Sequence, residues 1–170
     1  MVDRPLRITV VGGGRCDTKT ASDAERVGAA IARGGGVLVS GGLGGVMEAA
    51  SRGAHHAGGL TVGILPGERA SDANEFVTVP IVTGLGQARN IVNVLSGDAV
   101  VALPGEGGTL SEIAVALRSS VPVAAVDSWR EIDGVRVFDS PEEAVDAAFE
   151  MARAARAGGK RRSPWDRDDE

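Results

Sequence analysis

The sequence has no tyrosine, one cysteine and few aromatic residues, and each shortage excludes a class of protein. Aromatic residues make up 3 % of the 170 residues, which is too few for the stacking platforms that hold single-stranded nucleic acid. Cys16 is the single cysteine, so it forms no internal disulfide, and this favours a reducing compartment, the cytoplasm. No segment approaches the ~18 apolar residues that span a bilayer, and the N-terminal sequence lacks the pattern of a secretory signal, so we expect no membrane partner.

The chain also lacks an excess of positive charge. Its formal net charge of -5 would repel a phosphate polymer, and the one dense basic run, residues 160–162, is followed three residues later by the acidic sequence DRDDE. We therefore expect no nucleic-acid partner. His55 and His56 are adjacent and point to different faces of their helix, and no acid or cysteine completes a metal site beside them. We expect no metal.

What the sequence does contain is a regular alternation of short β-branched runs with segments of helical periodicity. The strand runs are almost continuously apolar, as a parallel sheet buried on both faces requires. We therefore predict a single-domain α/β fold, a Rossmann-like open parallel sheet with helices on both faces. The expected strands cover residues 7–13, 37–40, 60–65, 76–82, 98–103 and 122–126, and the expected helices cover about 20–33, 45–57, 87–96, 110–119 and 141–156.

Local signals refine this outline. Pro80 cannot donate a hydrogen bond to a neighbouring strand, so the strand that contains it is expected to lie at an edge of the sheet or to end early. Thr20 and Asp23 have the spacing of a capping box at the start of the first helix, and Ser140 caps the last helix. We expect one domain over residues 1–156 and a disordered tail over 157–170, with Trp165 as its one anchor.

Three glycine-rich turns follow predicted strands, at 12–14, 41–45 and 104–108. The carboxyl ends of parallel strands line one edge of such a sheet, where ligands bind. Glycine lets backbone N–H groups approach an anion, and each turn opens a helix whose N-terminus favours phosphate. The turns therefore predict a phosphate or nucleotide site, although Asp17 stands where a dinucleotide fingerprint needs a third glycine. The expected ligand-binding residues here are Gly13, Gly14, Gly41, Gly42, Gly44, Gly45, Pro104, Gly105, Gly107 and Gly108.

Glu112 has two interpretations. With Thr109 as N-cap it completes a capping box at the start of a helix. Alternatively it faces a bound ligand together with Arg89, which lies near the start of another helix at the same edge of the sheet. A guanidinium there holds a phosphate by two parallel bonds, and a carboxylate beside it suits cleavage of an N-glycosidic bond. The sequence alone leaves both interpretations open.

Three segments resemble a known superfamily: GGLGGVMEAASRGA at 41–54, TGLGQARN at 83–90 and SGDAVVALPGEGGTLSEIAVAL at 96–117. They are similar, in the same order, to the Lonely Guy (LOG) and lysine-decarboxylase-like group of Rossmann proteins, and most similar to its branch of molybdenum-cofactor carrier proteins. The resemblance covers roughly residues 6–127. It implies a pocket for a nucleotide monophosphate or a molybdopterin-type cofactor, with no further cofactor required, and assembly into homodimers or higher homo-oligomers.

The enzymes of this superfamily release a free base from a nucleoside 5'-monophosphate, using an arginine followed by a lysine and then a PGGxGTxxE motif. By this resemblance Arg89 and Glu112 take the catalytic positions, and Gly105, Gly108 and Thr109 match the second motif. Two residues depart from the pattern: Asn90 replaces the lysine, as in the carrier branch, and Glu106 replaces a glycine. The first hypothesis is therefore a binding protein in which Asn90 and Thr109 also contact the ligand, and the alternative is a phosphoribohydrolase. A lysine decarboxylase is excluded, because no lysine stands in the context of a pyridoxal Schiff base.

Overall fold

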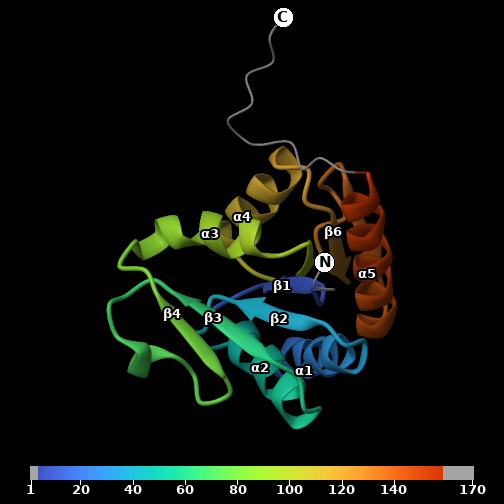
Figure 1. Ribbon diagram of the computed structural model, residues 1–170. Helices are drawn as coiled ribbons and strands as arrows, with labels where there is room; N and C mark the ends of the chain where they lie inside the picture. The colour runs from blue at the N-terminus through green and yellow to red at the C-terminus, as the bar shows by residue number, and fades with distance from the viewer. Residues whose placement is uncertain (1–3, 159–170) are drawn as a thin grey trace, which may run out of the picture.

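Seven parallel strands form one sheet in the computed structural model, which describes residues 4–158 (Figure 1). Their spatial order is β4-β3-β2-β1-β5-β6-β7. Strands β2 to β4 are added on one side of β1 and strands β5 to β7 on its other side, so the strand order switches between β1 and β5. In chain order the strands are β1 (Arg7–Val11), β2 (Val37–Ser40), β3 (Thr61–Leu65), β4 (Val79–Val82), β5 (Ala99–Ala102), β6 (Val123–Val126) and β7 (Val135–Phe138).

Helices cover both faces of this sheet (Figure 1). One core cluster joins the sheet to α1 (Thr18–Arg33), α2 (Val46–His56) and α5 (Pro141–Ala157). The second cluster joins the opposite face to α3 (Arg89–Ser96) and α4 (Gly107–Arg118). Two 3-10 turns, η1 (Ala70–Asp72) and η2 (Gly86–Ala88), lie in the connections on either side of β4.

The predicted fold class is confirmed, because all strands are parallel and the central β5 and β6 are buried on both faces. The strand containing Pro80 is an edge strand, as its missing N–H requires. Ser140 caps α5 by accepting a hydrogen bond from the backbone N–H of Glu143. The expectation for the tail and Trp165 lies outside the described residues, apart from Ala157, the last residue of α5, and Gly158, which caps that helix.

Two local expectations were wrong. The first helix begins at Thr18, because the carboxylate of Asp17 accepts the backbone N–H of Thr20 at 2.7 Å and so caps the helix three residues before the expected box. The strand β7 was not predicted. Its four residues are partly exposed, so they lack the continuous apolar pattern by which the other strands were recognised.

Asp98 holds together the edge of the sheet at which the strands begin. Its carboxylate accepts hydrogen bonds from the backbone N–H and the guanidinium of Arg7, and from Arg156 of α5 at 2.7 Å. Arg156 also donates to the backbone carbonyls of Arg4 and Pro5. The Asp98 side chain is buried, but these donors outweigh the effect of burial and lower its pKa from 3.8 to about 2.

We predict that Asp98→Asn lowers the free energy of unfolding by about 2 kcal/mol at pH 7, the equivalent of this pKa shift. A depressed carboxyl pKa stabilises the fold above the unfolded-state value, so the difference between the two proteins should shrink as the pH falls from about 4 to about 2. Urea unfolding across this pH range measures it. The control is Asp146→Asn, an exposed acid on α5 for which we expect a change below ~0.5 kcal/mol; equal effects of the two substitutions would contradict the role of Asp98.

Candidate functional site

The three glycine-rich turns meet at the carboxyl edge of the sheet, where β1 and β5 lie side by side and the strand order reverses. Backbone hydrogen bonds join them directly. The N–H of Gly13 in the first turn donates to the carbonyl of Pro104 in the third at 3.0 Å. The carbonyl of Gly13 in turn accepts the N–H of Val46, the first residue of α2 after the second turn, at 3.0 Å. The three turns therefore form one connected rim.

Glycine is required where these turns touch. Gly45 has φ 65°, and a Cβ on it would collide with the carbonyl of Gly13. A Cβ on Gly105 would collide with the Thr109 side chain. The second turn is also held from outside, because the side-chain amide of Asn74 donates to the carbonyl of Leu43 at 2.9 Å. The turns can therefore touch only because glycine occupies the positions at which they meet.

A cavity of about 570 Å³ opens at this rim. Of the residues predicted from the sequence, those that line it are Gly13, Gly14, Arg89, Asn90, Gly105, Gly108, Thr109 and Glu112. The other residues that were predicted to bind the ligand lie in the second and third turns but do not line the cavity, and they are Gly41, Gly42, Gly44, Gly45, Pro104 and Gly107.

Six further residues line the cavity and were not among the predicted contacts: Gly12, Arg15, Leu43, Met47, Gln87 and Glu106. Each lies within or close to a segment that the sequence analysis had singled out. For Gln87 the available signal was the segment at 83–90, and for the other five it was a position in or near a glycine turn. Neither signal shows which side chains turn inward. Leu43 and Met47 form an apolar part of the wall, while Arg15 and Glu106 bring opposite charges to it.

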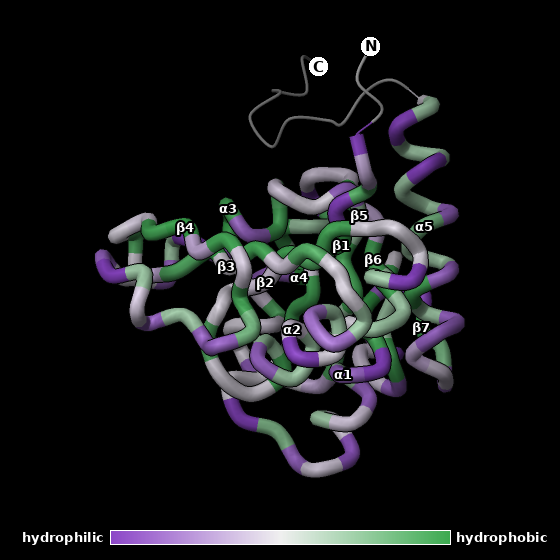
Figure 2. The backbone as a smooth tube through the Cα atoms, turned by 60° about the horizontal axis from the view of Figure 1, so that its bottom comes forward, coloured by the Kyte–Doolittle hydropathy of each residue, from purple (hydrophilic) through white to green (hydrophobic). Residues whose placement is uncertain are grey.

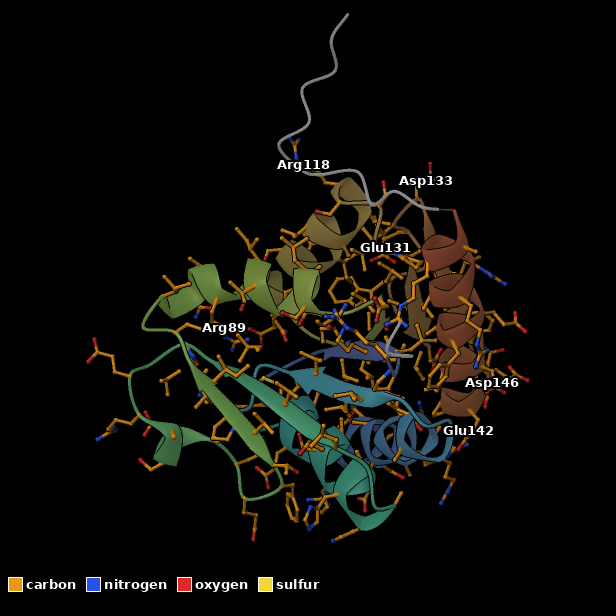
Figure 3. All side chains as sticks on the ribbon, in the orientation of Figure 1. Arg89, Arg118, Glu131, Asp133, Glu142 and Asp146 are labelled. Atoms are coloured by element: carbon orange, nitrogen blue, oxygen red, sulfur yellow. The ribbon has the colours of Figure 1, made fainter. Side chains whose placement is uncertain are left out.

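Arg89 is the first residue of α3 and is buried, with 7 % of its surface exposed. It projects from the side of α3 that faces the sheet (Figure 3), and its guanidinium packs against Gly41, where a Cβ would collide with it. The Nε atom has no hydrogen-bond partner, and no carboxylate among residues 4–158 lies within ion-pair distance of the guanidinium. Burial lowers the pKa of Arg89, against the charge of Glu112, although an arginine remains protonated.

Glu112 is not a helix cap, so the capping-box interpretation was wrong. The helix α4 begins at Gly107 with Glu106 in the N-cap position, which puts Thr109 inside the first turn and Glu112 a turn further on. The carboxylate instead accepts a hydrogen bond of 2.9 Å from the side-chain amide of Asn93 on α3. Burial raises the pKa of Glu112, while this hydrogen bond and the charge of Arg89 act in the opposite direction.

The site therefore combines a buried cation that lacks an anionic partner with a buried carboxyl group and glycine-rich turns. The Oδ1 atom of Asn93 is likewise buried without a partner. Such a site can hold an anion on Arg89 and the turns, and it keeps Glu112 beside the bound molecule. Within residues 4–158 there is no group of three or more His, Cys, Asp and Glu side chains that could hold a metal ion, and no helix long and apolar enough to cross a bilayer.

A Rossmann-type sheet with three glycine turns at its switch point, and with an arginine and a glutamate on the two helices beyond them, defines a LOG-like protein. The chain belongs to the SLOG cluster4 family, whose model matches residues 5–156. The resemblance inferred from the sequence motifs is thereby confirmed.

Solved structures of molybdenum-cofactor proteins are similar to this chain along its length. The molybdenum cofactor binding protein of Rippkaea orientalis is 38 % identical with a TM-score of 0.84, over 88 % of this chain and 99 % of that one. The Moco carrier protein of Chlamydomonas reinhardtii is 35 % identical with a TM-score of 0.81, over 89 % and 99 %. A cytokinin riboside 5'-monophosphate phosphoribohydrolase of Mycobacterium tuberculosis is 37 % identical over 128 residues, which are 68 % of this chain and 66 % of that protein.

Proposed function

We propose that this protein is a homo-oligomeric binding protein for a molybdopterin-type cofactor, whose phosphate is held by Arg89 and the three glycine turns. The single cysteine supports a reducing compartment, the cytoplasm, as its location. The similarity to molybdenum-cofactor carrier and binding proteins supports this class of ligand.

The observation that carries the proposal is the buried side chain of Arg89, which has no ion-pair partner among residues 4–158 and whose Nε atom has no hydrogen bond. Burying a charge without a partner is unfavourable, so the free protein carries a cost that an anion at this position removes. A phosphate accepts hydrogen bonds from a guanidinium in a fixed forked geometry. The turns add backbone N–H donors at a helix N-terminus.

The remainder of the cavity suits the rest of such a ligand. Its volume of about 570 Å³ lies in the range of small-molecule sites. The apolar side chains of Leu43 and Met47 offer a surface for a flat ring system. Glu106 accepts hydrogen bonds, and a pterin ring carries N–H donors along one edge. Because Glu106 places a negative charge at the third turn, we place the phosphate on the side of the three turns that is nearest to Arg89.

We further propose that a second copy of the chain packs against β4, η2, α3 and the start of α4. Seven exposed large apolar side chains occur there: Val79, Ile81, Val82, Leu85, Ile91, Val92 and Leu110. Figure 2 shows the tube green along β4 and much of α3. Between residues 76 and 105 the only charged residues are Arg89 and Asp98, and both are buried.

A face with so few charges favours a second copy as the occupant. Across a two-fold axis each residue approaches its own counterpart, so charges of one sign near the axis repel. Two chains with net charge -5 repel elsewhere on their surfaces, which leaves this apolar face as the favourable contact. Gln87 and Asn90 line the cavity and are close in sequence to the exposed Leu85 and Ile91, so the second copy would lie beside the cavity mouth.

We predict that the protein retains molybdopterin cofactor and that Arg89→Gln weakens this binding at least tenfold, because a charge-assisted hydrogen bond contributes about 1.5–3 kcal/mol. The cofactor is released from a denatured molybdoenzyme under anoxic conditions and mixed with the protein, and bound pterin is measured as its fluorescent oxidation product after gel filtration.

The control is Arg33→Gln, the same loss of charge at the exposed end of α1, which should leave retention unchanged. Since Arg89 is unpaired in the free protein, Arg89→Gln should melt at the same or a higher temperature than the wild type. Retention that does not differ between the wild type and Arg89→Gln would reject the proposed site.

The phosphoribohydrolase of Mycobacterium tuberculosis and the buried Glu112 beside Arg89 support a second candidate, hydrolysis of a nucleoside 5'-monophosphate. Under our first proposal AMP and GMP are recovered intact after long incubation, and chromatography for free base and ribose 5-phosphate detects neither product. Release of base that Glu112→Gln abolishes, with Asp146→Asn as a control, would establish the hydrolase instead.

We predict that Ile91→Glu converts the oligomer to monomers of 17.3 kDa, because it places two carboxylates near the proposed axis. Light scattering after gel filtration measures the mass. The matched control is Leu60→Glu, which alters an equally exposed apolar residue outside this face and should leave the oligomer intact. A monomeric wild type, or dissociation by both substitutions, would count against the proposed interface.

A further inference from the structure

Trp129 lies outside the cavity, in the loop between β6 and β7, and its backbone is strained. Its φ is 61°, and that of Asp127 is 43°. Residues other than glycine rarely adopt this left-handed backbone conformation, and residues with bulky side chains adopt it least of all. Such strain persists where the surrounding contacts impose it, and it concentrates near functional sites.

The contacts around this loop account for the conformation. The backbone N–H of Asp127 donates to the carbonyl of Phe138 on β7 at 2.9 Å, and the hydroxyl of Ser128 donates to the carbonyl of Val126 at 2.8 Å. The ring of Trp129 packs against the apolar cluster that joins the sheet to α3 and α4. The loop is therefore held in place from both sides, and the indole has a fixed position.

The indole N–H of Trp129 donates to the carbonyl of Leu103 at 3.0 Å. Leu103 is fully buried and immediately precedes Pro104, and its own N–H donates to Val11 of β1 at 2.9 Å. Trp129 thus fixes the residue from which the third glycine turn departs. The next residue, Pro104, accepts the hydrogen bond from Gly13 that joins the third turn to the first.

We propose that Trp129 is a positioning residue of the anion site, which acts by holding the third turn in register with the first. This inference rests on the proposed binding function. Loss of the indole N–H leaves the buried carbonyl of Leu103 without a hydrogen-bond donor. Because an unsatisfied buried carbonyl is unfavourable, the third turn then moves to a position where this carbonyl finds another donor. Gly105 and Glu106 of this turn, which line the cavity, move with it, although Trp129 itself does not line the cavity.

The test compares Trp129→Phe with Ile132→Val, which removes apolar volume from the same loop and the same cluster without a bond to the rim. Two quantities are measured for each: the dissociation constant for molybdopterin cofactor, and the hydrogen exchange of the Gly13 amide by NMR in the ligand-free protein. We expect Trp129→Phe to raise the dissociation constant about fivefold, the equivalent of one hydrogen bond, and to speed Gly13 exchange. Ile132→Val should change neither beyond its effect on global stability.

Unchanged affinity and unchanged Gly13 exchange in Trp129→Phe, in a wild type that binds cofactor, would overturn the inference and leave the binding function standing. If the wild type binds no cofactor, the proposed function fails, and Gly13 exchange still decides the role of Trp129. If Trp129→Phe does not fold, the indole N–H of the wild type is followed instead, with Trp165→Phe to assign its signal. Slow exchange supports the hydrogen bond to Leu103, and exchange as fast as in free tryptophan contradicts it.

Discussion

The rest of the site depends on the side chain of Arg89, which is buried, leaves its Nε atom without a hydrogen bond and has no ion-pair partner among residues 4–158. A protein selected for stability alone has no reason to keep a cation at the start of α3 against the bare backbone of Gly41. Glu112 adds to the cost, since burial also disfavours its ionised form. A polar ligand would explain both buried charges, because its hydrogen bonds to Arg89 and Glu112 would offset the cost of burying them and so stabilise the folded protein.

The two edges of the sheet divide stability and function between them. At the amino edge, Asp98 joins Arg7 and Arg156 in a well-satisfied network that ties α5 to the sheet. At the carboxyl edge, polar atoms of Arg89 and Asn93 are buried without partners. Separation of this kind lets the fold tolerate an unfavourable site, because the charged groups that stabilise the chain are not those that face the ligand.

Preorganisation connects the site to the rest of the molecule. The hydrogen bonds from Trp129 to Leu103, from Gly13 to Pro104 and from Val46 to Gly13 run across all three glycine turns. They join backbone N–H groups and one indole N–H to backbone carbonyls, and none of these groups carries a charge, so they position the rim and leave the guanidinium of Arg89 available to the anion. Rigid placement of this sort improves binding by reducing what must be ordered when the ligand arrives.

The sequence by itself determined the order of strands and helices through β6, the parallel sheet and the three turns, because apolar periodicity and glycine placement act over short stretches of chain. It also indicated Arg89 and Glu112. It did not show β7, whose four residues bury too little apolar surface to give a pattern. Nor did it decide between cap and site for Glu112, since the answer depends on where α4 begins and on Asn93, nineteen residues away on another helix. Only the tertiary structure settled such matters, because burial, unpaired polar atoms and the bond from Trp129 to Leu103 arise from contacts between segments far apart in the chain.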